Sequence, residues 1–105
     1  MNQEELQVAA FEIILNSGNA RTTVHEAFSA MREGHYDKAE EKLDLANTEL
    51  VGAHRAQTKL LQDYASGIEM KMEIIMVHAQ DHLMTTMTLR EVALEMLNLY
   101  RKVEQ

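Results

Sequence analysis

The sequence predicts an all-α protein, and more specifically an antiparallel up-down-up three-helix bundle. The chain of 105 residues has no proline and only four glycines, so the commonest helix breaker is absent. Three stretches of about 30 residues carry apolar residues spaced three and four apart, the pattern of a helix with one buried face. Only short glycine-containing stretches separate them, so neighbouring helices must run antiparallel.

The first helix is expected over about residues 4–32. Its seam, the row of apolar or small residues expected to be buried, comprises Leu6, Ala10, Ile13, Ser17, Ala20, Val24, Ala27 and Met31. Residues 16–19 interrupt the pattern with poor helix formers, which predicts a kink or a close approach of another helix. Gly34 follows the helix in the position where glycine usually ends one.

The second helix is expected over about residues 37–65, and Asp37 with Glu40 resembles a capping box at its start. Its seam comprises Tyr36, Ala39, Leu43, Ala46, Leu50, Ala53, Gln57, Leu60 and Tyr64. Gln57 is the one residue that breaks the apolar character of this row. Residues 65–69 should form the second turn.

The third helix is expected over about residues 70–102. Its predicted seam comprises Ile75, Ala79, His82, Thr86, Leu89, Ala93, Met96, Tyr100 and Val103. Apolar residues also cover most other sides of this helix, more than two partner helices can bury. The sequence therefore predicts self-association, with a methionine-rich monomer core as the alternative.

Composition and charge limit the class of protein. The length predicts a single domain over residues 1–105. A net charge of −7 argues against nucleic acid as a partner, and the absence of cysteine excludes disulfides and thiolate chemistry. Residues 1–5 are acidic and do not resemble a signal peptide. No run approaches the roughly 18 apolar residues that span a bilayer, so we expect a cytoplasmic protein.

A polar stripe on the third helix is the strongest functional signal. His78, Asp81, His82 and Thr85 lie three and four residues apart, and therefore on one face. Their neighbours are apolar on nearly every side, so we expect little water around these side chains. Burying imidazoles and a carboxylate costs free energy unless they are paired or used.

The stripe has three interpretations. The histidines could be structural, as we expect for the solvated His25 and His35, and His54 could line a cleft or only edge the bundle. The spacing of His78 and His82 partly mirrors zinc-binding helices, but a catalytic zinc site needs a third protein ligand that the sequence does not offer. Alternatively, one imidazole could carry a phosphoryl group, which requires a nucleophile on a rigid scaffold.

Several segments resemble one known family. They are residues 77–85 (VHAQDHLMT), 16–21 (NSGNAR), 53–60 (AHRAQTKL) and 34–39 (GHYDKA). Together they are similar to the lactose/cellobiose-type IIA component of the bacterial phosphoenolpyruvate-dependent sugar phosphotransferase system. The resemblance covers essentially the whole chain.

The resemblance implies a phosphotransferase component that forms a homotrimer of nine helices. His78 would accept a phosphoryl group (tele-type phosphohistidine) from the histidine phosphocarrier protein and pass it to a cysteine of the cognate IIB component. Asp81 from three subunits would meet on the threefold axis and hold Mg²⁺ or a similar divalent cation. His82, Thr85 and His54 are possible residues lining the site.

The resemblance further implies β-disaccharide uptake in which a membrane IIC permease, contacted only indirectly, selects the sugar. This chain would bind no sugar itself. The version of the motif around His78 looks more like the cellobiose, chitobiose or lichenan branch than the lactose branch. The alternative function is a tetratricopeptide-like interaction module without phosphotransfer, although such repeats need about three units for stability.

Overall fold

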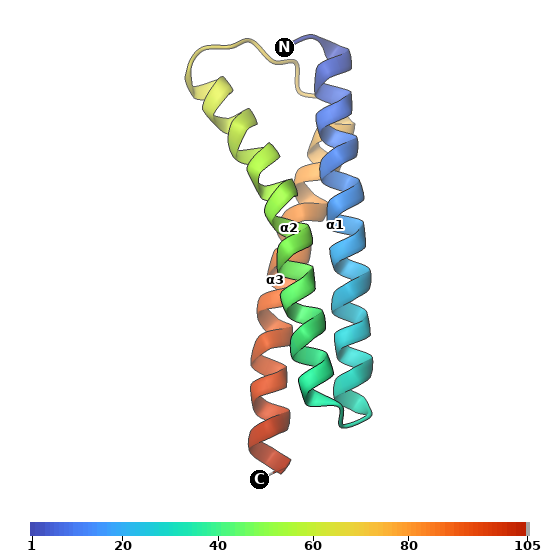
Figure 1. The fold of residues 1–105 in the computed structure, drawn as a ribbon. Helices are drawn as coiled ribbons and strands as arrows, with labels where there is room; N and C mark the ends of the chain where they lie inside the picture. Colours follow the sequence, from blue (N-terminus) through green and yellow to red (C-terminus); the bar gives the residue numbers. More distant parts are fainter. Residues whose placement is uncertain (105) are drawn as a thin grey trace.

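The computed structural model describes residues 1–104 and contains three α-helices. They are α1 (Gln3–Arg32), α2 (Tyr36–Ala65) and α3 (Ile74–Glu104), and this described part has no strand. α2 runs antiparallel to both α1 and α3, which are parallel to each other (Figure 1). The bundle measures 55 × 20 × 19 Å. The predicted up-down-up three-helix bundle is therefore confirmed.

Local hydrogen bonds define both ends of α1. The Asn2 side chain caps its start, because Oδ1 accepts from the backbone N–H of Glu5 at 2.8 Å. Gly34 follows the other end with φ of +80°, and its N–H donates to the carbonyl of Met31 at 3.1 Å. This left-handed conformation suits glycine, which confirms the predicted helix stop.

The capping box predicted at the start of α2 is wrong. The helix begins at Tyr36, and His35 stands at the N-cap without a side-chain cap hydrogen bond within the described chain. The carboxylates of Asp37 and Glu40 instead pair with the guanidinium of Arg101 in α3, each at 3.0 Å. A cross-helix ion pair thus replaces the local cap and fastens α2 to the C-terminal end of α3.

The third helix begins at Ile74, four residues later than the predicted start near residue 70. The C-terminal part of α2 diverges from α1 (Figure 1). The connection must bring the chain back across this gap. Residues outside a helix span roughly twice the distance per residue that helical ones do, so residues 68–73 stay non-helical. The first backbone hydrogen bonds of α3 then run from Met76 and Val77 to the carbonyl of Glu73.

The predicted seams agree with the buried residues in α1 and largely in α2, but not in α3. All eight predicted seam residues of α1 are buried, as are six of those in α2, whereas Tyr64 is exposed. The buried residues of α3 are Met76, Ala79, Leu83, Thr86, Ala93 and Leu97. Three predicted members, Ile75, His82 and Met96, are each one residue too early, Leu89 is half-buried, and Val103 is exposed. The cause is that α3 carries a second apolar face.

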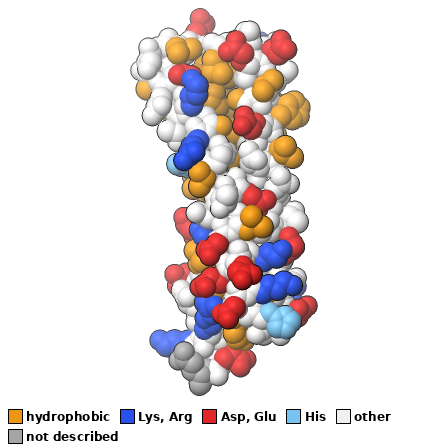
Figure 2. Space-filling model, viewed as in Figure 1, with side chains coloured by type: hydrophobic (Ala, Val, Ile, Leu, Met, Phe, Trp, Pro, Cys, Tyr) orange, Lys and Arg blue, Asp and Glu red, His pale blue; other side chains and the backbone are white. Residues whose placement is uncertain are grey.

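That second face lies open to solvent in the single chain. Its exposed apolar residues are Ile74, Val77, Met84, Val92, Met96, Leu99 and Val103. On the molecular face in Figure 2, hydrophobic side chains gather in the upper half, whereas charged ones are densest in the lower half. No helix within residues 1–104 combines the length and hydrophobicity needed to cross a bilayer.

Candidate functional site

His78 and His82 form a stacked pair on the side of α3 that faces α1. Their ring centroids are 6.0 Å apart, and the ring planes differ by only 15°. One helical turn separates the two residues, which places both rings above the same face of α3. The His78 side chain is exposed, whereas His82 is half-buried. An incoming group can therefore reach His78, while its neighbour is held against the bundle.

The α1 motif predicted to be a close-approach point provides that support. A β-carbon built on Gly18 would lie 3.6 Å from Nε2 of His82. Because glycine has no side chain, the His82 ring can pack close to the backbone of α1 at this position. Helix α1 continues without a break through this segment, and of the two predicted outcomes the close approach is confirmed.

The environment of His82 favours its neutral form. Burial is the main cause that lowers the pKa of His82, followed by the positive charge of Arg21 and the neighbouring His78, while Asp81 acts in the opposite direction. Desolvation and a nearby cation both disfavour the imidazolium ion. A neutral His82 beside an exposed His78 is therefore the expected state near neutral pH.

The expectation that water is scarce around the whole stripe is wrong for the single chain. His78, Asp81 and Thr85 are exposed, and only His82 is half-buried. The Thr85 hydroxyl donates to the backbone carbonyls of Asp81 at 2.8 Å and His82 at 3.3 Å. This hydroxyl is therefore engaged with its own helix rather than with an imidazole. The expectation failed because the apolar residues near the stripe belong to the exposed face of α3.

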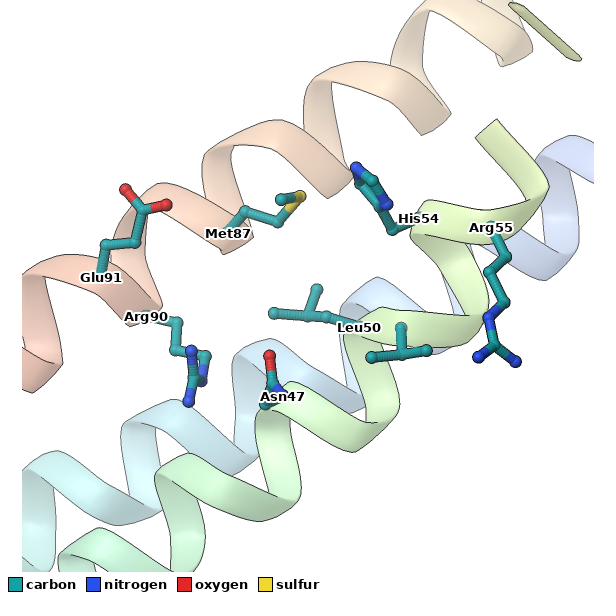
Figure 3. A pocket seen from close by; sticks show the side chains of 8 residues that line it. Asn47, Leu50, His54, Arg55, Met87, Arg90 and Glu91 are labelled. Atoms are coloured by element: carbon teal, nitrogen blue, oxygen red, sulfur yellow. The ribbon is translucent and has the colours of Figure 1, made fainter. Parts of the chain in front are cut away.

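His54 lies in a different place from the stacked pair. It lines a cavity of about 310 Å³ between α2 and α3, together with Leu50, Met87 and Arg90. In Figure 3 the His54 ring reaches toward α3, and Arg90 extends toward α2. The Nε of Arg90 donates to the carbonyl of Leu43 at 2.8 Å. His54 thus lines a cleft, as one reading of the sequence allowed, and His78 is not among the residues that line it.

Asp81 lies on the exposed face of α3. Within residues 1–104, no group of three or more histidine or carboxylate side chains is arranged to hold a metal ion. The zinc-hydrolase interpretation therefore lacks the third protein ligand that it requires. For a metal ion, each copy of the chain offers one carboxylate at Asp81.

Two arginines have no role predicted from the sequence. Arg21 acts on His82 through its charge, and Arg90 lines the separate cavity with His54. A signal for Arg21 was present, because it lies three residues after Gly18 and so near the same side of α1. No comparable signal identified Arg90, whose role depends on a carbonyl in another helix.

Comparisons with known proteins agree on one family. The family model described as the lactose/cellobiose-specific IIA subunit of the phosphotransferase system matches residues 8–101. Two relatives align over 102 residues and 97% of this chain. The lichenan-specific IIA component of Bacillus subtilis is 43% identical, with 93% of its length covered. The lactose-specific component of Staphylococcus epidermidis is 41% identical, with 98% covered.

Solved structures show the same likeness. The crystal structure of PtcA from S. mutans is 77% identical with a TM-score of 0.95, covering 96% of this chain and 99% of that one. The chitobiose IIA protein of Escherichia coli, solved in complex with HPr, is 35% identical with a TM-score of 0.81, covering 95% and 97%. With the family model and the relatives, these matches set aside the alternative of a tetratricopeptide-like module. The chain belongs to the lactose/cellobiose-specific IIA family of the sugar phosphotransferase system.

Proposed function

We propose that this protein carries a phosphoryl group on His78, from the histidine phosphocarrier protein to a cysteine of the cognate IIB component. The observation that carries the proposal is the exposed His78 ring, stacked on a His82 that α1 holds in place. The E. coli relative, whose solved structure is a complex with HPr, supports the choice of donor. A small helical surface with one accessible nucleophile suits two successive partners.

The chemistry needs only nucleophilic displacement at phosphorus. The lone pair on Nε2 of neutral His78 attacks, a new N–P bond forms, and the N–P bond to the donor histidine breaks. In the second step the IIB thiolate attacks, an S–P bond forms, and His78 recovers its lone pair. The phosphoryl group adds up to about two negative charges. The guanidinium of Arg21, which acts on His82 through its charge, can offset part of this charge.

We further propose a homotrimer in which the exposed face of α3 lies at the centre. Val77, Asp81, Met84 and Thr88 follow the three-and-four spacing of a coiled-coil seam along this face. Three copies of Asp81 would then face one another. Three carboxylates in one place repel, so a hard divalent cation such as Mg²⁺, which prefers oxygen ligands, fits the donor set. The cation would neutralise charge at the interface and takes no part in transfer.

The identity of the sugar stays a prediction. The chain carries phosphate, and sugar selection would fall to the permease. The relatives named for lichenan and for lactose are almost equally similar to this chain. The expected preference for the cellobiose, chitobiose or lichenan branch therefore depends on the motif around His78 alone.

Replacing the nucleophile tests the proposal. His78→Gln should keep the helical content and remove all acid-labile phosphate after incubation with phosphoenolpyruvate, its phosphotransferase and the phosphocarrier protein. His54→Gln is the matched control, because His54 lies in the separate cavity, and it should accept phosphate as the unmodified protein does. Near-normal labelling of the His78→Gln variant would move the nucleophile elsewhere and refute the assignment.

A further inference from the structure

The cavity of about 310 Å³ between α2 and α3 contains an arginine that no carboxylate neutralises. We call it the α2–α3 cavity. Its apolar floor consists of Leu50, which is buried, and Met87, which is half-buried, and Asn47 and Arg90 also line it. Among the ion pairs of residues 1–104, none involves Arg90. The cavity therefore has an unpaired positive charge in a chain whose net charge is −7.

A hydrogen bond orients the guanidinium of Arg90 and leaves its outer nitrogens available. Nε donates to the carbonyl of Leu43 at 2.8 Å, the one hydrogen bond of this side chain within the described residues. Arg90 extends toward α2, and Asn47 points into the space between the two helices (Figure 3). The two terminal nitrogens form a planar fork that matches two oxygens of a phosphate group. The arrangement therefore favours an oxyanion beside Asn47.

The other charged residues of the lining do not point into the cavity. In Figure 3 the side chains of Arg55 and Glu91 point away from the space between Leu50 and Met87. Both are exposed, and their charges are opposite. Arg90 therefore determines the sign of the charge that the interior attracts.

The rest of the lining fits a ring with one apolar face. The apolar floor suits the C–H face of a sugar ring, and the His54 ring closes the end of the cavity opposite Arg90 (Figure 3). Hydroxyl groups at the edge of such a ring can hydrogen-bond to the Asn47 amide or to solvent. The volume falls at the lower end of the range of small-molecule sites, about 300–1,000 Å³, and exceeds what a bare phosphate ion fills.

We propose that the α2–α3 cavity binds a phosphorylated sugar. The phosphate contacts the terminal nitrogens of Arg90 and the amide of Asn47, and one face of the sugar ring lies on the apolar floor. The phosphate supplies most of the affinity, so the free sugar is not a ligand. A sugar phosphotransferase system yields phosphorylated sugars, so the ligand is a product of the process in which this protein acts. That source of the ligand rests on the proposed function, whereas the cavity does not.

The α2–α3 cavity is separate from the site of phosphoryl transfer. Met87 follows His78 by nine residues, which is half a revolution around α3 and about 14 Å along it. Arg90 lies about 160° around α3 from Thr88, a member of the proposed central seam of the trimer. A bound sugar phosphate would therefore contact neither His78 nor the axis. It would link α2 to α3, so occupancy should raise the melting temperature.

Titration followed by NMR tests the site, with glucose 6-phosphate as the probe and glucose and inorganic phosphate as its two fragments. The probe should shift the amide signals of residues 47–55 and 87–91 in a saturable way. It should bind about tenfold or more tightly than either fragment, because only the intact ester contacts both Arg90 and the apolar floor. Equal affinity for inorganic phosphate would make the cavity a general anion site and overturn the proposal. Absence of saturable shifts in these two segments would overturn it as well.

Two substitutions test the contacts. Arg90→Gln should weaken binding of glucose 6-phosphate about tenfold or more. Arg55→Gln, with the same loss of charge on a side chain that points away, is the matched control and should bind with nearly the same affinity. Because Arg90→Gln also removes the hydrogen bond to Leu43, Asn47→Asp provides a second variant at an exposed position. Its added carboxylate should repel the phosphate and abolish binding, with the helical content unchanged in circular dichroism. Unchanged affinity in both folded variants would overturn the proposal.

Phosphate uptake by His78 is measured separately, in the unmodified protein without glucose 6-phosphate. Uptake without binding of glucose 6-phosphate would overturn this inference and leave the proposed function intact. Binding without uptake would support the cavity and refute the carrier function, and with it the source assigned to the ligand.

Discussion

Arg21 influences the reactive region from the neighbouring helix. Its positive charge is the second-largest cause of the lowered pKa of His82, after burial. The pKa of the imidazole, measured by NMR titration, should therefore fall below the ordinary value of about 6.5. Arg21→Gln should raise this pKa because it removes a cation that disfavours protonation.

The same shift fixes the direction of a pH effect on stability. Between the lowered pKa and about 6.5, the unfolded chain binds a proton at His82 that the folded chain does not. The contribution of His82 to the free energy of unfolding therefore increases with pH across that window.

Arg55→Gln is the control for the Arg21→Gln variant, since Arg55 lines the separate cavity between α2 and α3. An equal rise of the His82 pKa in both variants would contradict a specific role for Arg21.

Site residues were predictable from the sequence where one helix brings them together. His78 and His82 stack because they are one turn apart, and periodicity alone predicts that proximity. The support from Gly18, the charge of Arg21 and the separate location of His54 depend on how α1 and α2 pack around α3. Those relations join residues dozens of positions apart, and no spacing rule contains them.

At the scale of single elements, two glycines should respond in opposite directions to the same substitution. Gly34 has φ of +80°, a conformation that costs other residues about 1 kcal/mol or more. Gly52 lies within α2, where a β-carbon would meet only the Asn16 side-chain nitrogen at 3.7 Å, an ordinary contact. Gly34→Ala should therefore lower the melting temperature by several degrees. Gly52→Ala should raise it, because alanine favours a helix interior by up to about 1 kcal/mol over glycine.

Thermal unfolding followed by circular dichroism measures both variants. The pair serves as its own control, since the change in side chain is identical. A rise in melting temperature for Gly34→Ala would mean that the turn after α1 adopts another backbone conformation in solution.

The helices differ in how well their pattern predicts their buried face. In α1 a single apolar row stands out against polar neighbours, and its eight predicted residues are all buried. In α3 apolar residues surround the helix, so several rows fit the same period. The predicted row there selected Ile75 and Met96, whereas the bundle buries Met76 and Leu97. The start of α3 was predicted too early because sequence periodicity does not reveal the gap that the connection must cross.

At the scale of the whole molecule, Asp81 should govern assembly rather than chemistry. Asp81→Leu should leave a folded trimer that still accepts phosphate, since replacing buried charges with apolar groups is often neutral or stabilising. It should also abolish any divalent cation bound per trimer, measured by elemental analysis. Asp81→Lys should dissociate the particle, because three ammonium groups would meet at the axis. Light scattering should then fall from about three times the chain mass of 12.0 kDa to a single chain.

Asp44→Lys, an equal charge change at an exposed position of α2, is the control and should remain trimeric. Loss of phosphate uptake in a folded, trimeric Asp81→Leu variant would contradict the division between assembly and chemistry. Dissociation of the control would show that overall charge, not the axial position, governs assembly.

Polar contacts between α2 and the other helices are concentrated in the N-terminal half of α2. Glu49 accepts from Thr23 at 2.7 Å, Lys42 pairs with Glu26 at 3.2 Å, and the carbonyl of Leu43 accepts from Arg90 at 2.8 Å. The C-terminal part of α2 diverges from α1 (Figure 1). Local unfolding should therefore begin at the C-terminal end of α2 and stop near its N-terminal half, which these polar contacts hold to α1 and α3. The backbone amides of residues 58–65 would then exchange with solvent through fraying, at a lower free-energy cost than global unfolding, and subunit assembly would slow that exchange.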